Sequence, residues 1–461
     1  MRKGIIGDIL RSAELVDALH SFTEVLSFID KRNSALTVNI RKIPLASCVG
    51  WHYSETEGAI VNDKNAFFSI TGLLECGQGQ TAEQPIILQQ EIGMLGIICK
   101  KFDGILYFLM QAKIEPGNIN AIQISPTIQA TRSNFTQQHG GAKPLYLDNF
   151  INATSDKIIV DQLQSEQSSR FLKKRNRNII IECTEDIEVS PAHIWLTLGQ
   201  IKKLMHFDNL VNMDTRTVLS CIPYSADSGQ FPEITSFKGA DTALLRSMFK
   251  PADRGQITAV FNKLNDMKMF DYTKRRTVPL FSLSGWEMQN DEFCCKMPYP
   301  FKVIFCDIEI EAREVRHWCQ PLFEATEIAV FGLFTTVDNG VRKFLVQLKR
   351  EIGCLDVAEL APSVQDCGDI CGHDSVYSLF NDRLAGKSGV LCDVLLSEEG
   401  GRFYHEQNRN VIVEIDKEEI KTLPDNYFWC DYATLNYFVQ FNNCLNIQLR
   451  NLLSLLEVQH V

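Results

Sequence analysis

The chain contains an internal repeat that runs through most of its length. Residues 84–129 align without a gap on residues 320–365, and fourteen of these 46 positions are identical. The run Gln111-x-Lys113-x-Glu115-x-Gly117 recurs as Gln347-x-Lys349-x-Glu351-x-Gly353. A duplication of this extent means two like units of about 190 residues each, so that one fold must serve for both.

The match continues toward the C-terminus with small gaps. Residues 165–171 correspond to 397–403, and residues 195–220 correspond to 429–454. Before the main match, Gly50-Trp51 pairs with Gly285-Trp286. We therefore expect an N-terminal helix (1–34), a first repeat (35–230), a helical bridge (231–275) and a second repeat (276–461).

Each unit is expected to consist mostly of strands followed by C-terminal helices. Strands are predicted at four short segments rich in Ile, Leu, Phe and Val, namely 37–43, 67–74, 92–99 and 105–113. Apolar residues at helical spacing predict a helix over 194–219, a counterpart over 429–457, and a leading helix over 5–30. The fold class is α+β, an internal duplication of a mixed β-sheet domain with flanking helices.

Charge and composition exclude several classes of function. The 461 residues carry a net charge of −11, which argues against nucleic-acid binding as the main role. No apolar stretch predicts a membrane span or a signal peptide, so we expect a cytoplasmic protein with reduced cysteines. The motifs GxGxxG, GxxxxGK(S/T), HExxH and GxSxG are absent, and no cofactor is expected. The spacing of Cys367, Cys371 and His373 matches no standard zinc pair, so no metal site is predicted.

Gln111, Lys113 and Glu115 alternate along a predicted strand and so share one face of the sheet. A lysine and a glutamate on one face can orient an anionic sugar nucleotide and hold a proton-transfer group. The alternative is a surface salt bridge beside a turn. Other polar residues of this stretch are candidates for substrate binding: Asn118, Gln129, Thr131, Arg132 and Asn134.

Two further polar segments follow in the first unit. The run Lys-Lys-Arg-Asn-Arg-Asn is a local positive cluster, and its Arg175 and Arg177 suit two phosphates; a solvated charge run is the alternative. The second segment places Asn212, Asp214 and Arg216 on a predicted helix. Asp214 is a candidate catalytic group, although Asp214 with Arg216 could instead pin the helix to the sheet.

Three other residues are candidates for single roles. His139 lies on a glycine-containing loop, where a histidine suits proton transfer. Trp51 and Trp286 occupy equivalent positions in the two copies, and each could stack on a base.

These motifs resemble those of the NDP-hexose 2,3-dehydratase family. In the first copy they are QPIILQQEIGMLG (84–96), LMQAKIEPGN (109–118), SPTIQATRSNF (125–135), SEQ (165–167), KRNRN (174–178) and VNMDTRTVLSCIP (211–223). In the second copy they are REVRHWCQPL (313–322) and SEEGGRF (397–403). One position departs from the pattern, since Ala82 stands where the second copy has Trp318.

The resemblance implies a duplicated Nudix-like fold, a homodimer, and 2,3-dehydration of TDP-4-keto-6-deoxy-D-glucose in deoxysugar biosynthesis. The Nudix box, GX5EX7REUXEEXGU, is absent from both copies, which argues against pyrophosphate hydrolysis. In the implied reaction a base removes the proton at carbon 3, cationic donors stabilise the enolate, and an acid assists loss of the 2-hydroxyl. An NADPH-dependent 3-ketoreductase would consume the 3,4-diketo product. The alternatives are a non-catalytic or regulatory nucleotide-sugar binding protein and, behind it, a pyrophosphate hydrolase.

Differences between the copies indicate which one holds the chemistry. Asp214 of the first copy becomes Gln448 in the second, so the first copy keeps more polar function. We expect the working site there, with His139 or Glu115 as the base and Lys113 as the enolate stabiliser. The second copy is the alternative site or a non-catalytic nucleotide pocket. Its candidate substrate-binding residues are Arg313, Trp318, Lys349, Glu399 and Arg402.

Overall fold

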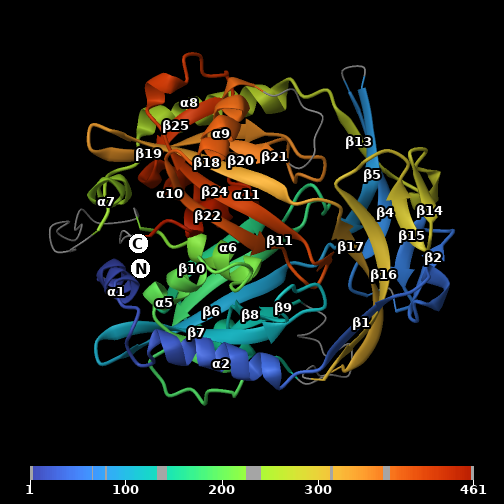
Figure 1. The fold of residues 1–461 in the computed structure, drawn as a ribbon, viewed down its shortest axis with the longest axis horizontal. Coiled ribbons are helices and arrows are strands. Elements are labelled where there is room, and N and C mark those ends of the chain that lie inside the picture. Colours follow the sequence, from blue (N-terminus) through green and yellow to red (C-terminus); the bar gives the residue numbers. More distant parts are fainter. Residues whose placement is uncertain are drawn as a thin grey trace.

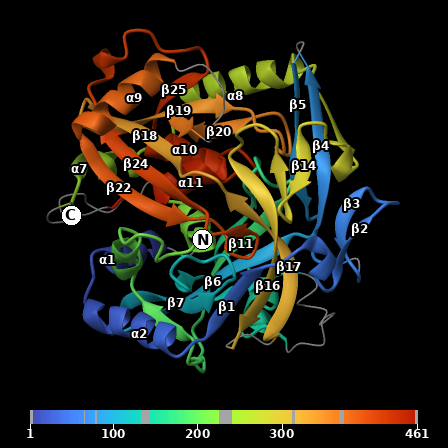
Figure 2. The ribbon, with the colours of Figure 1, turned by 45° about the vertical axis from the view of Figure 1, so that its right-hand side comes forward.

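The structure is a computed structural model that describes residues 4–64, 66–77, 80–131, 143–224, 240–311, 315–366 and 374–457. Within these residues the chain forms four β-sheets with helices packed around them, an α+β architecture (Figures 1 and 2). The elements of the first half, residues 4–224, recur in the same order in the second half, residues 240–457.

Each half begins with two helices. These are α1 (Ile5–Ala13) and α2 (Phe22–Ser34) in the first half, and α7 (Thr242–Met248) and α8 (Arg254–Met269) in the second. The single helix predicted over residues 5–30 is wrong, because Ser21 starts a new helix through a capping box with Glu24. No helix among the described residues is long and apolar enough to cross a membrane.

Two seven-stranded mixed sheets form the centre of the molecule. The first contains β10 (Ile158–Ser165), β11 (Arg175–Glu182), β6 (Gly93–Phe102), β7 (Ile105–Ile114) and β12 (His193–Leu196) in that order, with β8 (Ile122–Ser125) beside β7 and β9 (Ile128–Ala130) beside β6. The second runs β22 (Val390–Ser397), β24 (Gln407–Glu414), β18 (Ala329–Asp338) and β19 (Val341–Lys349). There β20 (Glu359–Pro362) and β25 (Tyr427–Asp431) pair with β19, and β21 (Val364–Asp366) pairs with β18. Each sheet has one parallel pair, β11 with β6 and β24 with β18.

Several helices cover these central sheets. α4 (Leu147–Ile151) precedes β10, and α9 (Ser375–Gly386) precedes β22. α5 (Leu198–Leu204) and α6 (Met213–Ser220) follow the first sheet, and α10 (Tyr432–Val439) and α11 (Ile447–Ser454) follow the second. The long helices predicted over 194–219 and 429–457 are each a strand followed by two helices. In the first, Thr197 and Asn212 cap the two separate helices. α6 and α11 pack against each other between the halves.

Two outer sheets exchange a strand between the halves. β2 (Trp51–Ser54), β3 (Ala59–Asn62), β4 (Ser69–Gly77) and β5 (Gln80–Leu88) are joined by β13 (Lys274–Val278). β14 (Trp286–Gln289), β15 (Glu292–Cys295), β16 (Phe301–Ile310), β17 (His317–Ala325) and β23 (Phe403–Tyr404) are joined by β1 (Val38–Lys42). Figure 1 shows β1 beside β16 and β13 beside β4. Since β16 and β4 are equivalent strands, the exchange is reciprocal.

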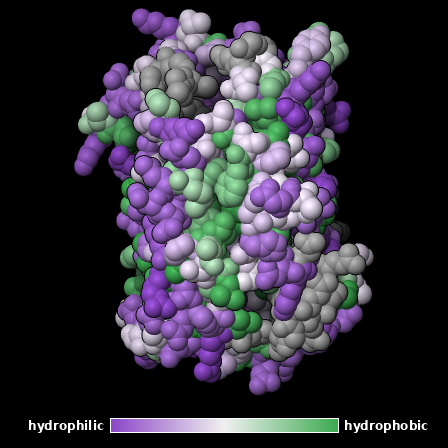
Figure 3. All heavy atoms as spheres, turned by 90° about the vertical axis from the view of Figure 1, so that its right-hand side faces the viewer, coloured by the Kyte–Doolittle hydropathy of each residue, from purple (hydrophilic) through white to green (hydrophobic). Residues whose placement is uncertain are grey.

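The outer sheets present a partly apolar surface. Figure 3 shows a band of apolar side chains between polar flanks on this side of the molecule. Phe281 and Met288, from the second half, are among the exposed large apolar side chains. The ring of Phe281 also packs on Tyr53 of the first half, with 4.3 Å between the ring centres.

Candidate active site

Lys113 and Glu115 form a buried ion pair where β7 ends. Their side-chain atoms Nζ and Oε1 lie 2.8 Å apart, and the two side chains are 17% and 7% exposed. Lys113 also donates to Oε1 of Gln129 on β9. The recurring strand motif therefore places a cation and an acid together on an interior face of the sheet rather than on the surface.

The second half supplies a third charged group to this place. The backbone N–H of Gly117 donates to the Gly400 carbonyl at 2.7 Å, and the N–H of His405 donates to the Gly117 carbonyl at 2.9 Å. This contact brings Glu399 to the ion pair. Burial, with a further contribution from the nearby Glu115, raises the pKa of Glu399 to about 7. Glu399 was expected in a separate second-copy site, and the structure corrects that assignment, since a loop of the second half crosses to the first.

The close contact between the halves explains a recurring glycine. A Cβ atom on Gly117 would lie 1.6 Å from the carbonyl oxygen of Phe403. On Gly353, the equivalent residue, it would lie 2.1 Å from the carbonyl oxygen of Phe171. Only glycine permits this approach of two backbones.

Asp214 completes the group of acids. It lies in the first turn of α6 and is 4% exposed. Burial raises the pKa of Asp214 well above its ordinary value, and the carboxylates of Glu166, Glu399 and Glu115 add to this shift. We refer to Lys113, Glu115, Asp214 and Glu399 as the first site. It combines one ion-paired carboxylate with two carboxyl groups whose pKa values are raised.

Further charged and polar side chains surround the first site. Glu166 accepts from Asn176 Nδ2 at 2.7 Å. Lys174 donates to the carbonyl of Glu91, and burial lowers the pKa of Lys174 to about 8 against the opposing effect of Glu166. Glu166 recurs in the repeat as Glu398 and lies within the motif SEQ (165–167). Arg402, which was predicted, donates to Gln89 Oε1 at 3.3 Å.

The other half contains an equivalent arrangement, which we refer to as the second site. The N–H of Gly353 donates to the carbonyl of Ser168 at 2.8 Å, so that a first-half loop crosses to the second half. Lys349 and Glu351 occupy the positions of the first-site ion pair. Gln448 and Gln167 stand where the first site has Asp214 and Glu399. The second site thus has amides in place of the two acids with raised pKa values.

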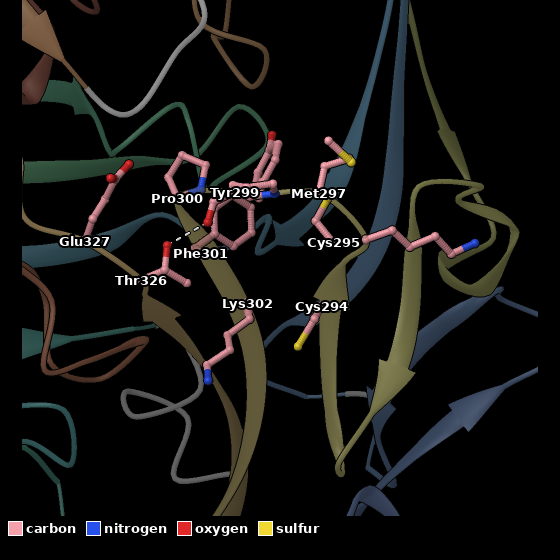
Figure 4. A pocket seen from close by; sticks show the side chains of 11 residues that line it. Cys294, Cys295, Met297, Tyr299, Pro300, Phe301, Lys302, Thr326 and Glu327 are labelled. Atoms are coloured by element: carbon pink, nitrogen blue, oxygen red, sulfur yellow. Dashed lines mark hydrogen bonds between the residues drawn. The ribbon is translucent and has the colours of Figure 1, made fainter.

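A cavity of about 560 Å³ lies at the outer sheet and not at the first site (Figure 4). Thr326 Oγ1 donates to the carbonyl of Tyr299 at its edge, at 2.6 Å. Pro300 and Glu327 line this cavity and also a much smaller one beside Gln167. The cavity therefore lies next to the second site. The acids of the first site do not line it.

The predicted tryptophans divide between core and site. Trp51 and Trp286 are 7% and 4% exposed, and their indole N–H groups donate to the carbonyls of Cys319 and Glu83. Both pack in the core of the outer sheets. Trp318 differs, because it donates to Gln320 at 2.9 Å, and Gln320 in turn donates to the Gly401 carbonyl of the loop that bears Glu399.

The predicted phosphate-binding cluster is divided by the alternation of β11. Lys174 and Asn176 face the interior, whereas Arg177 faces outward and forms two hydrogen bonds of 2.7 Å with Asp161. Arg175 lies on the outward face with Arg177. The two predicted arginines therefore share one face of β11, where Arg177 is already paired with Asp161.

The remaining predicted residues have structural contacts or lie outside the described part of the chain. Asn212 caps α6, and Asn118 Nδ2 donates to the Ala121 carbonyl at 2.8 Å. Lys349 donates to the carbonyl of Gln365 at 3.3 Å. Gln111 of β7 pairs with Ser125 of the neighbouring strand β8. Thr131 directly follows β9. Arg132, Asn134, His139, Arg313 and the segment 367–373 lie outside the described residues.

Comparison with known proteins agrees with this duplicated arrangement. The family model for NDP-hexose 2,3-dehydratase matches the chain twice, over residues 22–222 and 258–456. A protein of Saccharopolyspora spinosa named dTDP-4-dehydro-6-deoxy-alpha-D-glucopyranose 2,3-dehydratase is 37% identical, with 94% of this chain and 91% of that protein covered. Proteins of the same name from Amycolatopsis orientalis and Streptomyces violaceoruber are each 36% identical, over 96% and 92% of this chain and 92% and 94% of their own lengths. The chain belongs to the NDP-hexose 2,3-dehydratase family.

Proposed function

We propose that the chain catalyses the 2,3-dehydration of TDP-4-keto-6-deoxy-D-glucose to a TDP-3,4-diketo-2,6-dideoxyhexose, and that the first site carries the chemistry. The names of its relatives support the reaction. The difference between the two sites supports the location. The first site holds Asp214 and Glu399 where the second holds Gln448 and Gln167, and amides cannot exchange a proton in this role.

The roles in the first site follow from its charges. Glu115, ionised in its pair with Lys113, removes the proton at carbon 3 of the sugar. The electron pair moves onto the 4-keto oxygen, where the Lys113 ammonium stabilises the enolate. Glu399 then protonates the departing 2-hydroxyl, so that water leaves as the enolate collapses to a carbon 2–carbon 3 double bond. The resulting enol tautomerises to the 3,4-diketo sugar, and no redox step occurs.

Incubation of the protein with TDP-4-keto-6-deoxy-D-glucose alone tests the reaction. Release of TDP and maltol is the expected result, as is a 2-deoxy sugar when an NADPH-dependent 3-ketoreductase is present. An unchanged sugar would favour a binding protein, and release of TMP with sugar phosphate would favour a pyrophosphate hydrolase; either would overturn the proposal.

Substitutions that give the first site amides like those of the second test the location. We expect Glu399→Gln to lower kcat by about 100-fold or more, the usual scale for loss of a proton-transfer group. Asp214→Asn should lower kcat as well, because it removes the second acid that distinguishes the first site from the second. Glu351→Gln is the control, because Glu351 is a glutamate of the second site that is 9% exposed and accepts from Gln365 at 3.0 Å. Equal losses in Glu351→Gln and Glu399→Gln would contradict the assignment.

We further propose that each half is a Nudix-like unit and that the protein is a cytoplasmic homodimer. The Nudix-like assignment is supported by the mixed sheet of each half, which has one parallel pair and helices on its faces.

Light scattering on the purified protein tests the proposed homodimer. Oxidation of NADPH in the presence of a 3-ketoreductase tests the proposed consumption of the product.

A further inference from the structure

Arg216 is a buried cation that binds backbone carbonyls of both halves. It is 1% exposed, and its Nη1 donates to the carbonyl of Val211 at 2.6 Å. Its Nη2 donates to the carbonyl of Ser397, in the second half, at 2.7 Å. A buried guanidinium needs hydrogen-bond acceptors, and the two Nη contacts supply them, whereas Nε has no hydrogen-bond partner among the described residues. The two carbonyls therefore define the place of Arg216.

The carbonyl that Arg216 holds lies two residues before Glu399. The hydroxyl of the same Ser397 accepts from Nε2 of Gln123, a first-half residue on β8 that is 1% exposed, at 2.8 Å. Directly after Glu399, the Gly400 carbonyl accepts from the N–H of Gly117. The segment that bears Glu399 is therefore attached to the first half on both sides of that residue.

One helix carries both the attachment and a first-site acid. Asp214 and Arg216 lie two residues apart on α6, and the Asn212 side chain caps the same helix by accepting from the Thr215 N–H at 2.9 Å. A short capped helix is a rigid connection, so the position of Ser397 relative to Asp214 is fixed by Arg216. We infer that Arg216 is a positioning residue, which holds Glu399 of the second half in register with Glu115 and Asp214 of the first. This inference rests on the proposed function of the first site.

The second site contains the same attachment without the same acids. Arg450 of α11 is 0% exposed and donates to the carbonyls of Leu445 and Ser165, both at 2.5 Å. Ser165 lies two residues before Gln167, the amide that corresponds to Glu399. Loss of either arginine removes a bond to a carbonyl of the other half, and loss of Arg450 also removes the bond from its Nε to Thr217 Oγ1 at 3.0 Å. Only the segment held by Arg216 bears a proton-transfer group.

The test compares Arg216→Lys with Arg450→Lys in the full-length protein. Both are expected to lower the thermal midpoint, and Arg450→Lys by at least as much as Arg216→Lys, since Arg450 also bonds Thr217. We expect Arg216→Lys to lower kcat by about 30-fold with KM changed less than about threefold, because misplacing a proton-transfer group slows the chemical step more than substrate binding. Arg450→Lys should lower kcat at least about tenfold less than Arg216→Lys does. Equal kcat losses in the two variants would overturn the inference.

A double substitution tests whether Arg216 acts through Glu399. In a Glu399→Gln background, Arg216→Lys should lower kcat by less than about threefold, since the group that it positions is already absent. A full 30-fold loss in that background would show that Arg216 acts elsewhere, and would overturn the inference while leaving the dehydration itself intact. A wild-type protein that does not dehydrate the substrate would instead contradict the proposed function.

If the arginine variants do not fold, Ser397→Ala removes only the hydroxyl that accepts from Gln123. Ser165→Ala is its counterpart in the other half, where the hydroxyl donates to Glu359 at 3.0 Å. A kcat loss of about threefold or more in Ser397→Ala that Ser165→Ala does not share supports the inference. Equal kcat values in these two variants contradict it.

Discussion

At the scale of single residues, the protonation of Glu399 is expected to set the pH dependence of kcat. The pKa of this carboxyl is raised to about 7 by burial and by the nearby Glu115. Since the proposed acid must carry its proton, we expect kcat to fall by about tenfold per pH unit above about pH 7. The measurement is kcat between pH 5.5 and pH 9. In Glu399→Gln the residual rate should lack this decline, and a decline that persists unchanged would assign it to another group.

The same raised pKa makes Glu399 costly for stability at high pH. A carboxyl whose folded-state pKa lies above its unfolded value stabilises the fold below the ordinary pKa of 4.5, and this contribution is lost as pH rises toward 7. We therefore expect Glu399→Gln to raise the thermal midpoint by about 2 °C or more at pH 8. The gain should shrink toward pH 5. Scanning calorimetry at the two pH values checks it, and a gain independent of pH would contradict it.

Gly117 should tolerate no side chain, because its Cα faces the carbonyl of Phe403 across the interface. We expect Gly117→Ala to separate the Glu399 loop from Glu115, lowering kcat by about 100-fold and stability by about 2 kcal/mol. Gly353→Ala creates the equivalent clash in the second site. It should lower stability by a similar amount and kcat far less, as judged by urea unfolding and turnover of the two variants.

At the scale of elements, the exchanged strands couple each half to the other. Ile43 N–H donates to Phe305 O at 2.9 Å, so the N–H of Arg41, two residues earlier on the same edge, also faces β16. We expect Arg41→Pro to remove that hydrogen bond and to speed amide exchange in β16 by about tenfold, with β4 of its own half unaffected. Thr277→Pro in β13 should speed amide exchange in β4 and leave β16 unaffected. Hydrogen exchange read by mass spectrometry distinguishes the two, and faster exchange in β4 of Arg41→Pro would contradict the pairing.

The limits of the sequence are clearest at this scale. Strands were predictable from local apolar runs, and the repeat identified which elements are equivalent. The single long helices predicted over 194–219 and 429–457 are wrong, because the apolar residues of strands β12 and β25 continue directly into helices. In the first of these segments, Thr197 and Asn212 each cap a separate helix. The Lys113–Glu115 pair was predictable from strand alternation. The position of Glu399 beside that pair was not predictable from the sequence. It depends on whether the loop that bears Glu399 packs against its own half or crosses to the other, and the sequence is compatible with either.

At the scale of the whole molecule, each half is completed by the other. Each outer sheet includes a strand of the other half, and each site includes a loop of the other half. Arg216 and Arg450 make equivalent bonds in opposite directions across the centre, where α6 packs on α11. The two sites have diverged in their acids while these connections have stayed alike. The two halves of the chain are therefore intertwined like the subunits of a strand-exchanged dimer, and one segment of the chain links them.

That construction predicts that the link between the halves is dispensable once the chain has folded. A protease site inserted within residues 225–239 and cleaved in the native protein should leave two fragments that elute together, because the exchanged strands and the buried arginine contacts remain. We expect kcat to stay within about twofold of the uncleaved variant, since no first-site residue is removed and the fragments retain their mutual contacts. The uncleaved variant is the control for the insertion. Fragments that separate at micromolar concentration, or activity lost on cleavage alone, would show that the halves depend on the link and not on their contacts.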